Sequence, residues 1–305
     1  MPTLHVIILN YNRGDLLRTC LASLQHAAQA HPRHPYRMWV IDNASTDDSV
    51  AIIEREFPEI DLIKSPVNGG FAHGNNLVLR RLMTTPSLLA IDDYVMLLNN
   101  DTEITPDALE LLIHFMETNP TVGAVGPKVL LPDGSLDLAC RRSFPTPEVA
   151  FYRMSGLAKL FPHSRRFARY NLSFLPVDQQ SDVDALVGAA LLLRANVLRE
   201  IGLLDEAFFM YGEDLDWCYR IKAYGWRIVY EPRAVVHHHK RATSARHAAL
   251  TIHAFYDAMR IFHRKHYARD TLAPLNWLIE YGIMAKEAWA LLRNRLHTPL
   301  WQRVG

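Results

Sequence analysis

The chain has 305 residues, of which 49% are hydrophobic and 21% charged, and its formal net charge is +1. This length suits one large α/β domain with an appendage, and the composition excludes wholesale disorder. The small net charge gives no electrostatic reason to expect a nucleic-acid partner. The 3 cysteines are far apart and lack metal-ligand spacing, so we expect free thiols in a reducing compartment.

The N-terminus runs directly into a strand-like segment, with no basic region and no cleavage site of a signal peptide. The longest apolar run, residues 185–193, is too short to span a membrane. We therefore expect a cytoplasmic protein.

The first hundred residues alternate between strand and helix patterns. Short apolar runs rich in β-branched residues predict strands at 4–9, 38–41, 60–63 and 94–98. Apolar residues at helical spacing predict helices over 14–29, from residue 45 or 46, and over 71–83. This order implies a parallel sheet covered by helices, which binds its ligands at the carboxyl ends of the strands.

The pattern is less regular after residue 100. We expect helices at 106–118, 196–201 and 212–224, and strands at 122–125, 227–230 and 234–237. Residues 143–182 are rich in Pro, Arg and aromatic residues without a clear period, which predicts a long loop or flexible insert. From residue 244 onward we expect two amphipathic helices, broken near 270–274.

Four polar clusters each follow an apolar strand or open the next helix, at residues 10–12, 42–47, 68–76 and 99–103. Taken alone, each is typical of turn and N-cap residues. Because parallel strand ends lie side by side, however, the four together favour one ligand crevice. There Asp42 could accept a base imide hydrogen, and the glycines would let backbone approach the ligand. The glycine spacing G-G-x-x-x-G is not the dinucleotide fingerprint, so an oxidoreductase is disfavoured.

A fifth cluster contains the carboxylates Glu213, Asp214 and Asp216 near a helix start, where the helix dipole favours anions. Carboxylates beside aromatic residues suit a general base. The structural alternative is a capped surface helix, on which Asp216 and Arg220 are spaced to form an ion pair.

A sixth cluster is the histidine triplet 237–239 at the end of a strand. Alternation along the strand places His238 on the same face as Val236, where it could join a carboxylate on a divalent cation. A solvated strand end is the commoner explanation of such a triplet.

With these clusters together, the sequence resembles the family 2 inverting glycosyltransferases, in particular the bacterial rhamnosyltransferase-like branch. The resemblance runs from about residue 4 to 244. It rests on five ordered motifs: I-L-N-Y-N at 8–12, V-I-D-N-A-S-T-D at 40–47, N-G-G-F-A-H-G-N at 68–75, L-L-N-N-D at 97–101 and D-E-A-F-F-M-Y-G-E-D-L-D at 205–216.

The resemblance implies an α/β fold of the GT-A type, with a Rossmann-like mixed sheet, helices on both faces and additional C-terminal helices. It also implies a catalytic domain over 1–244, with a nucleotide-binding half (1–103) and an acceptor-binding half (104–244). Residues 245–305 would form a helical extension.

Position by position, the resemblance also implies roles for single residues. The donor nucleotide would be held by Leu9, Tyr11, Asp42, Asn43, Asn75, Asn99 and Asn100. Asp101 and His238 would hold the metal, and Asp214 occupies the position of the catalytic base. Because Asn99 replaces the first acidic residue of the family's D-x-D motif, an alternative motif of Asp101-Thr102-Glu103 stays open.

The expected cofactor is Mg²⁺ or Mn²⁺, since hard oxygen ligands and a diphosphate suit both. The residues of the motif at 208–214 resemble most those of enzymes that use dTDP-L-rhamnose as donor, and a UDP-sugar is the alternative. The expected acceptor is a cell-surface glycan or a lipid-linked saccharide. A sugar nucleotidyltransferase is disfavoured because no Gly-rich basic loop follows the first strand.

The C-terminal segment mixes aromatic and aliphatic residues with Arg and Lys, which suits a helix in the interface of an anionic membrane. Packing of these helices on the catalytic domain, or on a second subunit of a homodimer, is the alternative.

Overall fold

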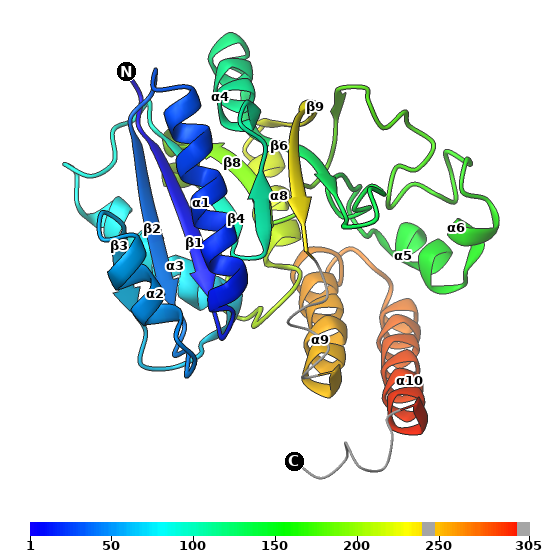
Figure 1. Ribbon diagram of the computed structural model, residues 1–305. Coiled ribbons are helices and arrows are strands. Elements are labelled where there is room, and N and C mark those ends of the chain that lie inside the picture. Colours follow the sequence, from blue (N-terminus) through cyan, green and yellow to red (C-terminus); the bar gives the residue numbers. More distant parts are fainter. Residues whose placement is uncertain (240–247, 298–305) are drawn as a thin grey trace.

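The computed structural model describes residues 1–239 and 248–297. Within these residues, the strands form one 9-stranded sheet in the order β3-β2-β1-β4-β8-β6-β9-β5, with β7 paired to β9 (Figure 1). The strands are β1 (Leu4–Asn10), β2 (Tyr36–Asp42), β3 (Asp61–Lys64), β4 (Tyr94–Asn99), β5 (Thr102–Ile104), β6 (Val122–Leu130), β7 (Ser181–Asp182), β8 (Ala190–Arg194) and β9 (Arg227–His238).

The sheet is mixed rather than wholly parallel. β1, β2, β3 and β4 pair in parallel, as the alternation of strands and helices predicted. β8 then lies antiparallel between β4 and β6, and β5 lies antiparallel to β9. The two short strands expected at 227–230 and 234–237 are one strand, β9, which continues through a register shift against β6.

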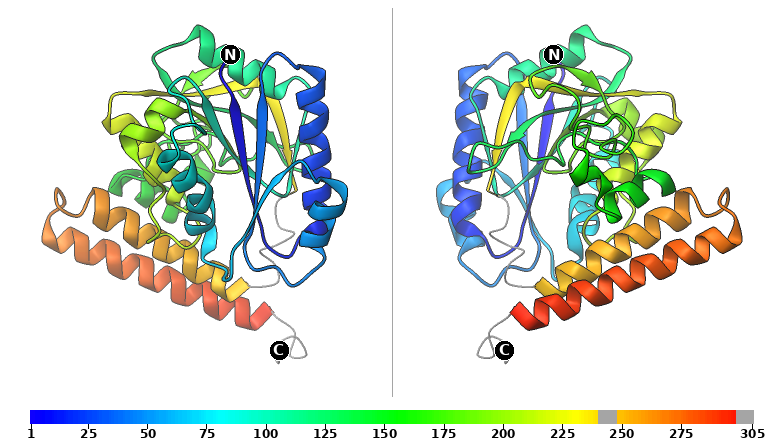
Figure 2. Two further views of the ribbon diagram at one scale, coloured as in Figure 1. Left: turned by 90° about the vertical axis from the view of Figure 1, so that its left-hand side faces the viewer. Right: turned by 90° about the vertical axis from the view of Figure 1, so that its right-hand side faces the viewer.

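Helices cover both faces of the sheet (Figures 1 and 2). They are α1 (Gly14–Ala30), α2 (Ser49–Glu56), α3 (Gly70–Thr84), α4 (Ala108–Thr118), α5 (Pro147–Met154), α6 (Leu157–Leu160), α7 (Ala195–Ile201), α8 (Glu213–Ala223), α9 (Ala248–His266) and α10 (Ala273–His297). Alternate residues of β1 enter two different hydrophobic clusters, Ile7 the one beneath α3, α7 and α8, and Val6 and Ile8 the one beneath α1, α2 and α4.

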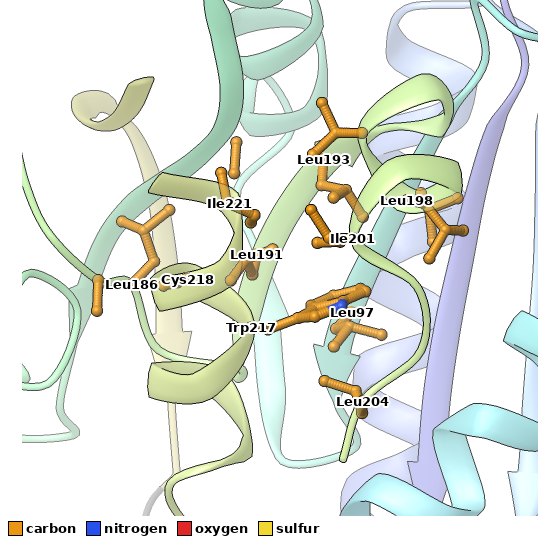
Figure 3. Close-up of a cluster of buried hydrophobic side chains, with 14 of the residues drawn as sticks. Leu97, Leu186, Leu191, Leu193, Leu198, Ile201, Leu204, Trp217, Cys218 and Ile221 are labelled. Carbon is orange, nitrogen blue, oxygen red and sulfur yellow. The ribbon is translucent and has the colours of Figure 1, made fainter. Parts of the chain in front are cut away.

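Trp217 of α8 is one of the two largest side chains in the core beneath α3, α7 and α8, and Trp39 of β2 is the other. Trp217 is fully buried among Leu97, Leu191 and Leu204 (Figure 3). Its indole N–H donates to the carbonyl of Gly202 at 2.9 Å, which satisfies its polar atom. This packing fixes α8 against the sheet, and therefore fixes the position of the carboxylates at its start.

Residues 143–182 are not the loop or flexible insert that the sequence predicted, because they contain α5 and α6 and are tied to the sheet. Arg141 is fully buried, and its guanidinium donates to the carbonyls of Leu175 and Pro176. The amide of Ser143 donates to the carbonyl of Tyr170. The prediction was wrong because a buried arginine that binds backbone carbonyls orders a segment without producing any hydrophobic period.

The two helices expected at the C-terminus are confirmed. α9 lies beyond the carboxyl end of β9, and α10 runs back alongside it as the outermost element (Figures 1 and 2). The predicted domain boundary at residue 244 lies outside the described residues, so the division into 1–244 and 245–305 stays a prediction. Within the described part of the chain, no helix is both long enough and apolar enough to cross a membrane.

Candidate active site

One large cavity, of about 1590 Å³, lies at the carboxyl ends of β1 and β4. Eight of the ten residues to which the resemblance gave roles line it: Leu9, Tyr11, Asn43, Asn99, Asn100, Asp101, Asp214 and His238. They come from loops and strand ends that are far apart in the chain. The structure therefore brings together the polar clusters that the sequence predicted to converge.

Side-chain amides connect the loops on the β1–β2–β4 side of this cavity. The side-chain oxygen of Asn12, Oδ1, accepts hydrogen bonds from the backbone amides of Thr46 and Asp47 at 2.7 and 3.3 Å. Asn43 donates to the side chain of Asn68 at 2.8 Å. Asn100 donates to the side chain of Asn10 at 2.6 Å. The strand-end loops are thus held in one arrangement before any ligand binds.

Gly70 lets two sequence-distant motifs meet at this cavity. It opens α3 with φ +85°, a left-handed conformation that favours glycine. The next amide, that of Phe71, donates to the Phe209 carbonyl at 2.8 Å. A Cβ on Gly70 would lie 2.2 Å from that carbonyl oxygen. The glycine pair at 69–70 therefore allows close approach of the chain segment that leads to Asp214.

Two of the predicted nucleotide contacts do not line the cavity. Asp42 is buried at the end of β2, where its Oδ2 accepts from the amide of Ser45 at 3.0 Å, and its Oδ1 has no hydrogen-bond partner among the described residues. Asn75 is buried within α3 and donates to the carbonyl of Phe71 at 2.9 Å. The contact between Asp42 and the nucleotide base of the donor stays a prediction. The side-chain amide of Asn75 forms its hydrogen bond within α3.

Asp101 and His238 meet because β5 and β9 pair with Thr102 opposite His238. The Nε2 of His238 lies 3.2 Å from the Oδ1 of Asp101, and its Nδ1 lies 3.2 Å from the Oδ2 of Asp137. Burial disfavours the charged ring, but the two carboxylates outweigh it and raise the pKa of His238 to about 9. Asp137 was not singled out in the sequence, since it lies in an irregular ribbon.

These side chains fit a divalent cation that also binds a diphosphate. Two ligands of one octahedral Mg²⁺ lie about 3 Å apart, close to the distance between Asp101 and His238. Asp137 is placed to accept the Nδ1 hydrogen, which would leave Nε2 free for a metal. In the described ranges no group of three or more His, Cys, Asp or Glu side chains could hold a metal ion. The remaining ligands would therefore come from phosphate and water.

The alternative motif Asp101-Thr102-Glu103 fits less well. Glu103 does not line the cavity, and its carboxylate pairs with the partly exposed His239 at 3.5 Å. The hydroxyl of Thr102 donates to the carbonyl of Asn99. Asp101 is therefore the carboxylate of this motif that faces the cavity.

Asp214 is buried in the first turn of α8 and is held on both oxygens. Its Oδ2 accepts from the guanidinium of Arg142 at 2.7 Å and from the amide of Gly188 at 3.1 Å, and its Oδ1 accepts from the amide of Leu215. Burial works against the charge of Arg142, but Asp214 outweighs it and raises the pKa of this guanidinium. The sequence showed Arg142 only as part of a basic stretch, and its partner lies 72 residues away.

The other two carboxylates of this cluster have different surroundings. Glu213 lines the cavity, its Oε2 lacks a hydrogen-bond partner among the described residues, and burial together with Asp214 raises its pKa to about 8. Asp216 does not line the cavity, because it pairs with Arg220, as the spacing predicted, and with His266 of α9. Glu213 and Asp214 are thus the carboxylates of this helix available to a substrate.

A sheet whose first four strands are parallel and whose other strands make it mixed, with helices on both faces and a cavity at the strand ends, is the arrangement of a GT-A-type fold. Residues 2–252 match the family model described as glycosyltransferase like family 2. The chain therefore belongs to this family and is a glycosyltransferase.

The chain is similar along nearly its whole length to an N-acetylglucosaminyl-diphospho-decaprenol L-rhamnosyltransferase of Mycobacterium tuberculosis. The identity is 28% over 296 residues, which cover 96% of this chain and 94% of the relative. It is 26% identical over 233 residues to the rhamnosyltransferase WbbL of Escherichia coli, covering 75% and 80% of the two chains.

Among solved structures, the mannosyltransferase PcManGT from Pyrobaculum calidifontis has a TM-score of 0.57 at 19% identity. The match covers 99% of this chain and 77% of that chain. TarS of S. aureus has a TM-score of 0.54 at 16% identity with the same coverage. At these identities the two structures support the fold.

Proposed function

We propose that this glycosyltransferase is an inverting, metal-dependent hexosyltransferase that moves a sugar from a nucleotide-diphosphate donor onto an acceptor hydroxyl. The observation that supports this proposal best is that Asp101, His238 and Asp214 line the same cavity. A candidate metal edge and a candidate base then face one space in which a sugar can lie between them.

On the donor side, Leu9, Tyr11, Asn43 and Asn100 would contact the nucleotide, and Asp101 and His238 would hold the cation. A bound Mg²⁺ or Mn²⁺ supplies neutralisation of the charge that develops on a leaving diphosphate. The PcManGT structure contains GDP-Man and Mn²⁺, which supports a divalent cation here.

On the acceptor side, the carboxylate of Asp214 would accept the proton of the attacking hydroxyl. The acceptor oxygen forms its bond to the anomeric carbon from the face opposite the diphosphate, and the bond to the diphosphate breaks with its electron pair. This geometry inverts the anomeric configuration. Arg142 and the amide of Gly188 would keep the carboxylate aimed at the hydroxyl during this step.

The test of the base is Asp214→Asn, which keeps the shape of the side chain. We expect turnover to fall by about 10²- to 10⁴-fold, while the thermal shift produced by the donor with metal is retained. Normal turnover in this variant would remove the base assignment. A loss of donor binding would assign Asp214 to the donor instead.

The donor sugar proposed here is L-rhamnose from dTDP-L-rhamnose, with a UDP-sugar as the alternative. The rhamnosyltransferase names of the relatives from M. tuberculosis and E. coli support the first choice. A thermal-shift screen of dTDP-L-rhamnose against UDP-sugars, each with Mg²⁺, Mn²⁺ or EDTA, tests both the donor and the metal. Stabilisation by a UDP-sugar alone would contradict the rhamnose assignment.

The acceptor proposed here is a saccharide of a growing cell-surface glycan, carried on a lipid. The decaprenol named in the relative from M. tuberculosis supports a lipid carrier. We accordingly place the enzyme in the cytoplasm, with peripheral membrane contact through residues 245–305. The alternative is that residues 245–305 contact a second subunit in a homodimer.

A further inference from the structure

The cavity is larger than the sugar-transfer chemistry needs. Its volume of about 1590 Å³ exceeds the roughly 300–1,000 Å³ of ordinary small-molecule sites. The additional space lies between α5, α9 and α10, away from the donor loops. α10 contributes a stripe at helical spacing to its wall, formed by Leu275, Leu278, Ile279, Gly282, Ile283 and Lys286.

The facing walls of this space are also mainly apolar. α9 contributes Phe255, Met259 and Phe262, and α5 contributes Ala150, Phe151 and Met154 together with the charged residues Glu148 and Arg153. The amine of Lys286 donates to the carbonyl of Met154 at 2.8 Å, which joins α10 to the end of α5. The same cavity therefore leads from Asp214 into an apolar channel between three helices.

The channel opens to the surface past an apolar rim. Leu278 of α10, Phe151 of α5 and Leu250 of α9 all line the cavity and are 66%, 60% and 52% exposed. A hydrocarbon chain that enters from outside would therefore meet apolar side chains from all three helices at the opening.

The outward surface of α10 is apolar, whereas a helix on the outside of a globular body is expected to be polar there. Its side toward α9 is polar: Glu280 pairs with Arg264, Glu287 pairs with Arg260, and Asn276 bonds to His263. Its outward surface bears Trp277, Tyr281, Met284, Trp289, Leu292 and Leu296, all exposed. Figure 2 shows α10 as the outermost element on this side of the molecule.

The charges of α10 follow the same division. Glu280 and Glu287 are the acidic residues of this helix, and both are paired with α9. Its outward surface is left with tryptophan, tyrosine and aliphatic residues, and Arg293 is exposed near its end. Aromatic residues beside cations, without acidic residues, are the composition that an anionic lipid interface favours.

We propose that the outward surface of α10 lies in the interface of an anionic bilayer, and that the channel between α5, α9 and α10 takes the hydrocarbon chain of the acceptor from that bilayer. The saccharide at the head of the chain is then presented to Asp214. This inference rests on the proposed function, and it adds the place where the hydrocarbon chain of the acceptor binds and the surface through which it is reached.

Gly282 offers a way to block the channel without unfolding α10. It lines the cavity, and a Cβ at this position meets nothing within 4 Å. Leucine and alanine are both better helix formers than glycine, so neither Gly282→Leu nor Gly282→Ala is expected to destabilise the helix. Leucine fills the channel, and alanine serves as the matched control.

With a polyprenyl-linked acceptor we expect Gly282→Leu to lose roughly tenfold or more in kcat/KM, and Gly282→Ala to match wild type. With a short, water-soluble glycoside acceptor all three proteins should be equal. An unchanged rate of Gly282→Leu on the polyprenyl-linked acceptor would overturn the channel. Failure of the wild-type enzyme to transfer sugar to either acceptor would overturn the proposed function instead.

The bilayer contact is tested by co-sedimentation with vesicles, which needs no turnover. The vesicles are phosphatidylcholine with about one third phosphatidylglycerol, compared with phosphatidylcholine alone. We expect wild type to bind the anionic vesicles and the double variant Trp277→Ser, Trp289→Ser to lose roughly tenfold in affinity. The control is Tyr224→Ser, an aromatic residue 60% exposed that precedes β9, at the opposite end of this strand from α9.

A second copy of the chain is the outcome that would overturn the bilayer contact. In that case wild type would be a dimer by light scattering without vesicles, the double variant would be a monomer, and neither would bind vesicles.

Discussion

The two walls of the catalytic cavity are built on different principles. The donor wall consists of loops at strand ends, connected to one another by the amides of Asn12, Asn43 and Asn100. The acceptor wall consists of α5, α9 and α10, whose cavity-facing residues are mainly apolar. A charged diphosphate needs fixed polar groups, whereas a hydrocarbon chain needs only space and apolar contact. Under the proposed function, the sheet would therefore fix the chemistry and the helices around it would select the acceptor.

Arg142 lines the cavity and binds Asp214, and among the substitutions that leave Asp214 itself in place its replacement should have the largest effect. In Arg142→Lys the amine cannot reproduce a guanidinium that binds both Asp214 and the Leu186 carbonyl. We expect kcat to fall by about 10²-fold through misplacement of the base, while donor binding is retained. Steady-state kinetics measure kcat, and the thermal shift produced by the donor measures whether donor binding is retained.

Arg141→Lys is the matched control for this prediction. Arg141 is also buried, but it binds the carbonyls of Leu175 and Pro176 rather than Asp214. We expect a lower Tm with an unchanged kcat of the folded enzyme. If both variants lose kcat equally, Arg142 acts through general stability and does not position the base.

Gly70 joins the donor wall to the segment that leads to Asp214, and Gly70→Ala should have an intermediate effect. The added Cβ meets the Phe209 carbonyl in addition to the cost of a left-handed φ. We expect a loss of about 1–3 kcal/mol in the free energy of unfolding, measured by urea denaturation.

Gly134→Ala separates these two costs. Gly134 has φ +78°, but a Cβ added there would meet nothing within 4 Å, so its substitution costs backbone strain alone. An equal loss at both positions would show that the close approach to Phe209 does not matter.

The contrast between the two walls also explains which parts of the structure could be predicted from the sequence. The donor wall was predictable because strand, turn and glycine signals are local, and parallel strands then bring residues 10–12, 42–47 and 99–103 to one edge. The segment that contains α5 was not predictable, because it is held by Arg141 through carbonyls 34 and 35 residues away, and the contact of Arg142 with Asp214, 72 residues away, was equally hidden. α10 was predicted as a helix, but the pairing of Glu280 and Glu287 with α9 decides which side faces outward.

Glu213 gives the smallest predicted effect, seen as a pH dependence of stability. The ordinary pKa of a glutamate side chain is 4.5. Burial, together with the charge of Asp214, raises the pKa of Glu213 to about 8 in the folded protein. A pKa raised on folding means that the folded state favours the protonated form, so stability is highest below pH 4.5 and falls as the pH rises to about 8. Glu213→Gln removes this loss. We expect its Tm to exceed that of wild type by about 2 °C or more at pH 9, and by less at pH 6.

Glu206→Gln is the control, because its linkage has the opposite sign. Burial works against the charge of Glu206, but hydrogen bonds from Asn76, His73 and Arg80 outweigh it and lower its pKa to about 2. Its contribution to stability is therefore complete above about pH 4.5 and is lost only as the pH falls toward 2. We expect Glu206→Gln to lower Tm by the same amount at pH 6 and pH 9. A constant difference for Glu213→Gln as well would mean that Glu213 is already ionised at pH 6, and that the start of α8 carries two negative charges beside Arg142 rather than one.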